Sequence, residues 1–232
     1  MLAAYRDLIF SPLALPEPPA VDTARLVAWM AWAREEGHKR GLNVPERDYE
    51  ARTGREFPWL MANVHYGRRS HVEDSFEREF AEVARYARQF PLREARLVVL
   101  LAQRGDVAGH LHADSDGFWG FRFYLTNRRR DALYFCLARE RVDELPQQSA
   151  GDSRYVEVER RRYARWPSGN PAFCLNSVRA AHAVDASSCV LGERIACLVM
   201  PREGIDEPRL LSLLEESSAR FADYQIWHRA AA

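Results

Sequence analysis

The middle of the chain alternates short apolar stretches with turn residues and has no helix-like segment between them. Such stretches are typical of β-strands, because side chains alternate along an extended backbone and a turn follows after a few residues. Strands that follow one another without an intervening helix usually pair antiparallel, which favours a sandwich or barrel over a parallel sheet. The expected strands cover residues 95–103, 119–126, 132–138, 155–166, 172–176 and 194–200.

Amphipathic helices are expected on both sides of this strand-rich region. One covers about residues 22–40, with its apolar side chains on a single face. Another begins at Ser70, whose spacing to Glu73 matches a capping box, and continues until Pro91 stops it. A last helix starts near Asp206. Each needs an apolar surface to cover, and the predicted strands supply one.

The length of 232 residues and a hydrophobic fraction of 47% are sufficient for one sizeable core. We therefore expect a single domain over residues 1–232, in which residues 94–201 form the β-rich core. Residues 1–93 are expected to be a helical N-terminal support and residues 202–232 a C-terminal helix. The opening through LPEPPA is expected to be irregular, because prolines lack a backbone donor.

Charge and cysteine content limit the partners. Lys plus Arg equals Asp plus Glu, 33 each, so the chain has no net field to hold nucleic acid or an anionic membrane. The four cysteines form no CxxC pair, no signal peptide is recognisable, and no apolar run approaches the roughly 20 residues that span a bilayer. These features predict a soluble cytoplasmic protein with no nucleic-acid or membrane partner, and leave its oligomeric state open.

The stretch HLHADSD, residues 110–116, concentrates imidazoles and carboxylates at one point of the chain. On a strand, a spacing of two places His110, His112 and Asp114 on the same face. Two imidazole nitrogens and one carboxylate can occupy one face of an octahedral metal, the ligand set of non-haem Fe(II) oxygenases. A surface turn stabilised by the aspartates is the structural alternative.

A histidine and an arginine much later in the chain complete a pattern with this stretch. They are His182 in NSVRAAHAVD and Arg194 in GERIACLV. HxD, a distal His and a downstream Arg, in this order, resemble the Fe(II)- and 2-oxoglutarate-dependent dioxygenases. LVVLLAQRGDVAGHLHAD followed by FRFYLTN is similar to the aspartyl/asparaginyl and bacterial proline hydroxylase branch. The resemblance covers about residues 95–200. It implies a double-stranded β-helix, which is a jelly-roll or cupin-like barrel.

The resemblance also implies roles for individual residues. The metal ligands would be His112, Asp114 and His182. Arg194 would bind the far carboxylate of 2-oxoglutarate, and the polar face of the following strand would face the same molecule with Arg122, Tyr124 and Thr126. The cofactors would be Fe(II), 2-oxoglutarate and O2, and the products succinate, CO2 and a hydroxylated substrate. An arginine inside a barrel is costly unless it meets an anion, which a dicarboxylate supplies.

The substrate is expected to be a small molecule such as a free amino acid or a biosynthetic intermediate. The residues that could contact it are His110, Trp119, Arg179 and Trp166, although an aromatic side chain in a β-rich core is more often packing. Other functions stay open. These are a hydroxylase of peptide or protein side chains, a cupin metalloenzyme that uses His110, His112 and His182 without 2-oxoglutarate, and a non-catalytic binding module on the same barrel.

Overall fold

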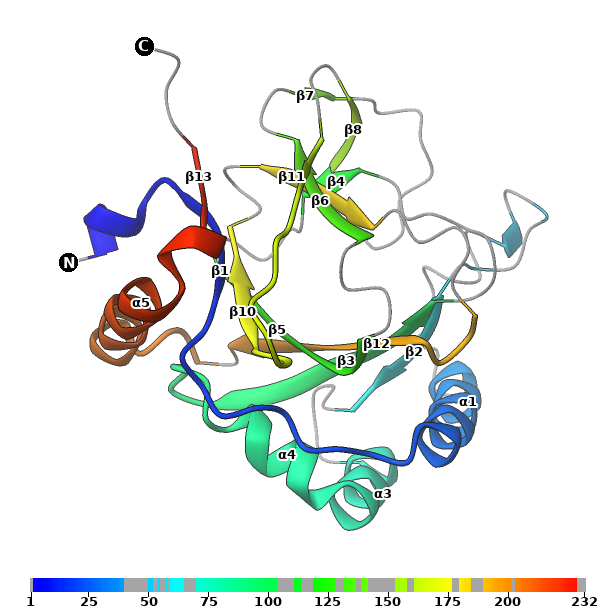
Figure 1. Ribbon diagram of the computed structural model, residues 1–232. Coiled ribbons are helices and arrows are strands. Elements are labelled where there is room, and N and C mark those ends of the chain that lie inside the picture. The colour runs from blue at the N-terminus through cyan, green and yellow to red at the C-terminus, as the bar shows by residue number, and fades with distance from the viewer. Residues whose placement is uncertain are drawn as a thin grey trace.

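The computed structural model shows a mainly antiparallel β-structure with helices packed on one side of it (Figure 1). It describes residues 2–39, 50–51, 54, 57, 59–64, 70–103, 111–113, 119–127, 132–136, 139–141, 153–157, 161–176, 180–184, 190–201 and 203–228. Every strand pair within these ranges is antiparallel. The β-rich class predicted from the short apolar stretches is therefore confirmed.

The strands form two sheets, and consecutive strands cross repeatedly from one to the other. The seven-stranded sheet has the order β13-β1-β10-β5-β12-β3-β2, and the six-stranded sheet the order β7-β8-β4-β11-β6-β9. The seven-stranded sheet consists of β1 (Leu8–Pro12), β2 (Trp59–Asn63), β3 (Ala95–Gln103), β5 (Gly120–Asn127), β10 (Phe173–Leu175), β12 (Arg194–Pro201) and β13 (Ile226–Trp227). The six-stranded sheet consists of β4 (His112–Ala113), β6 (Leu133–Cys136), β7 (Arg139–Arg141), β8 (Ser153–Glu157), β9 (Arg162–Tyr163) and β11 (Ala181–Val184).

The described helices are α1 (Thr23–Lys39), α3 (His71–Glu79), α4 (Ala81–Ala87) and α5 (Glu207–Phe221), with short 3-10 turns at Leu2–Tyr5 (η1) and Ala222–Tyr224 (η3). Of these, α1, α3 and α5 begin where the sequence indicates. Side-chain oxygens of Asp22, Ser70 and Asp206 accept backbone N–H groups in the first turns of α1, α3 and α5. None of the described helices combines the length and the apolar character needed to cross a membrane.

The structure differs from the sequence prediction at several places, and the short strands β2, β4, β7, β11 and β13 were not predicted. The expected helix from Ser70 is divided at Phe80, whose φ of −132° and ψ of 44° lie outside the helical region. The expected strand 155–166 appears as β8 and β9. The opening is not irregular throughout, because β1 precedes the proline-rich stretch and joins the sheet between β10 and β13. Residues 1–93 thus contribute strands as well as helices.

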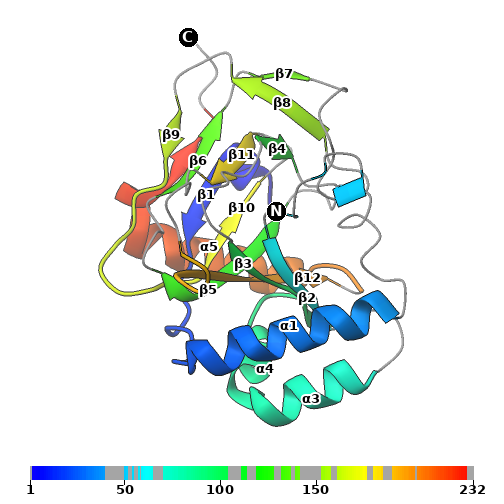
Figure 2. The same cartoon turned by 90° about the vertical axis from the view of Figure 1, so that its right-hand side faces the viewer.

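Apolar side chains form two main layers. The outer core lies between the helices and the seven-stranded sheet, where Tyr86 of α4 packs its ring 4.9 Å from that of Phe123. The inner core lies between the two sheets, where the rings of Phe10 and Phe135 are 5.6 Å apart. Figure 2 shows the resulting order of layers, with α1, α3 and α4 below the seven-stranded sheet, α5 behind it and the six-stranded sheet above. Among the described residues, strands of both sheets contribute side chains to the inner core, whereas the outer core takes its strand residues from the seven-stranded sheet.

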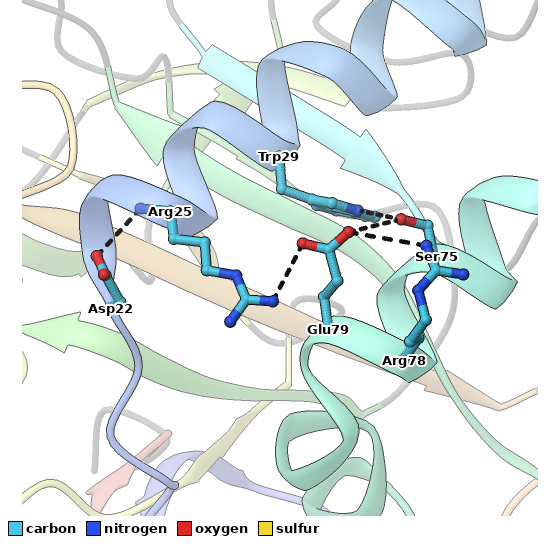
Figure 3. A network of polar contacts seen from close by, with 6 residues as sticks. All are labelled: Asp22, Arg25, Trp29, Ser75, Arg78 and Glu79. Carbon is cyan, nitrogen blue, oxygen red and sulfur yellow. Dashed lines mark hydrogen bonds and ion pairs between the residues drawn. The ribbon is translucent and has the colours of Figure 1, made fainter.

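Polar contacts hold α1 against α3 on the helical side (Figure 3). The indole N–H of Trp29 donates to Ser75 Oγ at 3.1 Å, and that hydroxyl donates to Glu79 at 3.1 Å. Arg25 pairs with the other carboxylate oxygen of Glu79 at 3.4 Å. The network satisfies the polar atoms that the packed helices would otherwise bury without partners.

Candidate functional site

Two histidines that are far apart in the sequence meet on neighbouring strands. β4 pairs with β11 so that His112 lies directly opposite His182, and their ring centroids are 4.5 Å apart. His182 is 1% exposed. Its neighbours Ala181 and Ala183 pack on the outer face of the six-stranded sheet, so strand alternation turns His182 towards the inner core, where Phe135 is its ring neighbour at 6.4 Å. The register of this strand pair therefore brings together two of the predicted metal ligands.

The third predicted ligand, Asp114, lies outside the described residues, as do His110 and Arg179. Within the described ranges, no three His, Cys, Asp or Glu side chains gather closely enough to hold a metal ion. Asp114 follows His112 by two residues, so the structure places the beginning of the HxD motif in the six-stranded sheet. The assignment of all three ligands stays a prediction.

Arg194 begins β12 and is buried, with 4% of its surface exposed. Its Nη2 donates to the Tyr124 hydroxyl at 3.0 Å. The guanidinium carbon lies 5.1 Å from the ring centroid of Tyr124 and 5.9 Å from that of Trp59. Nε is buried without an acceptor, and no carboxylate of a described residue forms an ion pair with this guanidinium. The surroundings are thus aromatic, with donors left over for a ligand.

β5 supplies the other residues predicted to face 2-oxoglutarate. Its two faces separate as expected, since Phe121, Phe123 and Leu125 belong to the outer core and Tyr124 to the inner core. Arg122 is 8% exposed and shares the face of Tyr124 by strand alternation.

Thr126 has a different set of contacts. Its hydroxyl donates to the Gly192 carbonyl at 2.8 Å and accepts the Ile195 N–H at 2.9 Å. One donor and one acceptor site of that hydroxyl are therefore occupied by backbone, and the residue fastens the turn that leads into Arg194. Tyr124, and not Thr126, contacts the guanidinium.

The two tryptophans proposed for substrate contact lie in different layers. Trp119 is 8% exposed and packs in the outer core, on the far side of the sheet from Arg194. Trp166 packs against the inner core, with its ring centroid 5.7 Å from that of Tyr124 and 5.1 Å from that of Phe173. The positions support a packing role for Trp119 and leave Trp166 beside the predicted cosubstrate residues.

Trp59 is the site residue that the sequence did not single out. It belongs to β2, outside the stretch that carries the HxD, His and Arg pattern, and it is 7% exposed. The sequence signal that could have found it is a tryptophan at the start of an apolar five-residue run, WLMAN, that alternates like a strand. Its partner could not be inferred without the order of strands in the sheet.

Comparison with known proteins gives little. No family model matches the chain, and no curated protein sequence matches it. One similar solved structure is an oxidoreductase of the 2OG-Fe(II) oxygenase family from Burkholderia pseudomallei, which is 12% identical. The match covers 79% of this chain and 91% of that one, with a TM-score of 0.35. A score this low carries no argument about fold or activity.

Proposed function

We propose that the protein is an Fe(II)- and 2-oxoglutarate-dependent dioxygenase that hydroxylates an unactivated C–H bond of a small molecule, with release of succinate and CO2. The observation that carries the proposal is the placement of Arg194, a buried cation that forms no ion pair with a carboxylate of a described residue and whose Nε has no acceptor among them. Burying an arginine without an anion is costly, so such a group in a protein interior indicates a bound anion. The planar fork of guanidinium N–H groups suits a carboxylate.

The two described histidines of the predicted ligand set, His112 and His182, fit an Fe(II) site. Neutral imidazoles are common ligands for Fe(II), and two of them face one another across β4 and β11. Asp114 would complete the set from the same motif. When bound, the metal supplies the activation of O2 and of the 2-oxo acid that hydroxylation requires.

The protein's own residues supply binding and exclusion of water. Arg194 would hold the far carboxylate of 2-oxoglutarate, and Tyr124 fixes the guanidinium through its hydroxyl. The inner-core rings of Phe10, Trp166 and Phe173 pack against one another and keep this end of the site dry. In a water-excluded site a charge pair is stronger than in solvent, which favours a dianionic cosubstrate.

The order of the strands supports a double-stranded β-helix. From β3 to β6, and again from β9 to β12, each strand lies in the opposite sheet from the one before. Two facing antiparallel sheets built in this way are the arrangement of a jelly roll. We further propose the aspartyl/asparaginyl and proline hydroxylase branch, on the motif alone, and an amino acid or biosynthetic intermediate as substrate.

The test is an anaerobic titration of the metal-free protein with Fe(II) and then with 2-oxoglutarate. The expected result is a weak visible charge-transfer band, which is absent in His182→Ala and retained in His71→Ala. His71 is the matched control because it is an exposed histidine paired with Glu36 at 2.9 Å, away from the inner core. Iron binding without the band would favour the cupin alternative. A wild-type protein that binds no iron would refute the proposal.

A further inference from the structure

We propose that Trp59 is a positioning residue for Arg194. The face of its indole ring contacts the guanidinium group and fixes its position, so that the guanidinium N–H groups stay available to the carboxylate of 2-oxoglutarate. The inference rests on the proposed function and deepens it, because it adds a residue from the N-terminal segment to the cosubstrate site. It starts from one contact, in which the guanidinium carbon of Arg194 lies 5.9 Å from the ring centroid of Trp59.

The sheet register explains how two residues on strands that do not pair directly can meet. β3 lies between β2 and β12, and Ala102 of β3 pairs with Leu60 on one side and with Ile195 on the other. Leu60, Ala102 and Ile195 all face the outer core. Trp59 and Arg194, each one residue earlier in its strand, therefore share a row on the inner face.

The length of the two side chains decides whether Trp59 and Arg194 can contact each other across β3. Adjacent strands are about 4.8 Å apart, so strands separated by one neighbour are about 10 Å apart. Only long side chains can span that gap, and a tryptophan and an arginine occupy the two ends. Tyr124 contacts the same guanidinium from the other neighbour of β12, with its ring centroid 5.1 Å from the guanidinium carbon. Arg194 is thereby held by rings from two elements.

An aromatic ring binds a guanidinium group in a different way than a carboxylate or a hydroxyl does. Attraction between the cation and the face of the ring uses none of the five N–H donors. Among the described residues, Nη2 donates to the Tyr124 hydroxyl, while Nε has no acceptor. Ala196, the next residue of β12 in the inner core, carries no polar group that could help. Trp59 can thus fix the guanidinium without competing with the ligand.

The expected effect is selective. Trp59→Leu keeps an apolar side chain but removes the ring, and should raise the Kd for 2-oxoglutarate about 3- to 30-fold while the Kd for Fe(II) stays unchanged. Trp59→Phe restores a weaker ring and should recover part of the loss. The control is Trp29→Phe, a buried tryptophan of the outer core that contacts Ser75 and not the site.

The experiment measures both constants anaerobically in the Fe(II)-loaded protein, together with the change in tryptophan fluorescence when 2-oxoglutarate is added. Trp59→Phe should lose part of that change although it still binds the ligand, because Trp166 also lies beside Tyr124, and Trp29→Phe should keep the change in full. If the wild type binds no 2-oxoglutarate, the proposed function and this inference both fail. If the wild type binds it and Trp59→Leu binds it equally well, or if both constants weaken together, only the inference fails.

Discussion

Replacing Arg194 should separate ligand binding from stability. The side chain is buried, donates to Tyr124 and forms no ion pair with a carboxylate of a described residue, so among these residues its charge has no counterion. Arg194→Met alone would remove that charge, but would leave the fully buried Tyr124 hydroxyl without its partner. The informative variant is therefore the double substitution Arg194→Met with Tyr124→Phe, which removes both polar groups and keeps most of the volume.

The expected energies predict that the double variant keeps or gains stability but loses affinity for 2-oxoglutarate. A hydrogen bond to a charged group contributes about 1.5–3 kcal/mol, and ring contacts with a cation add about 1–2 kcal/mol. Several kcal/mol of desolvation cost disappear with the charge, so the double variant should unfold with a free energy equal to that of the wild type or up to about 2 kcal/mol higher. Loss of the cation from a carboxylate pair costs about 2–5 kcal/mol, so 2-oxoglutarate should bind about 30- to 5,000-fold more weakly.

Chemical denaturation and anaerobic 2-oxoglutarate titration, done on wild type, both single variants and the double variant, measure these effects. Arg25→Met is the control, since it removes an exposed arginine that pairs with Glu79 on the helical side. It should leave 2-oxoglutarate binding unchanged. A double variant that is less stable by more than about 2 kcal/mol would refute the reasoning, because it would mean that Arg194 stabilises the ligand-free fold.

Three further predictions concern positions around the site and the core. Ser75→Ala should lower the free energy of unfolding by about 1–3 kcal/mol in chemical denaturation, because two hydrogen bonds of the network in Figure 3 are lost. Thr126→Val should lower it by about 1–2 kcal/mol and also weaken 2-oxoglutarate binding, because the hydroxyl fastens the turn before Arg194; a change in neither quantity would contradict this role. Burial raises the pKa of the Cys174 thiol to about 12, so only about 10⁻⁴ of it is thiolate at pH 8. In a Cys189→Ser variant, the remaining thiols should therefore resist a thiol reagent at pH 8 until the protein unfolds, and rapid native labelling would contradict the burial of Cys136, Cys174 and Cys197.

The sequence was sufficient to predict the structure where the residues of a single strand or helix determine it locally. Alternation along β5 predicted which side chains face each core, and the cap at Ser70 predicted the start of α3. The family resemblance implied that His112 and His182 share a metal site, but it did not predict that they lie opposite each other, since β4 and β11 are too short to be recognised by alternation alone.

The sequence was insufficient where tertiary contacts decide. Phe80 fits the periodicity of one continuous helix, yet its ring packs against Trp29 and Phe76 and its backbone leaves the helical region. The segment of β1 was expected to be irregular because prolines follow it, but its residues before Pro12 are buried in the sheet. In both cases the gain from burying apolar surface outweighs the local preference, and one sequence does not show which surface will be offered.

Trp59 shows why this limit matters for function. The HxD, His and Arg pattern lies within one continuous region, so it indicates chemistry but not how the cation is held. The order β12-β3-β2 places an N-terminal strand one neighbour away from Arg194, and only that order makes the tryptophan a partner of the arginine. A substitution in β2 that moved the register by one residue would turn Trp59 to the outer core, because side chains alternate with a period of two. The cosubstrate site therefore depends on strand register outside the motif, and variants that shift β2 should weaken 2-oxoglutarate binding while both histidines remain in place.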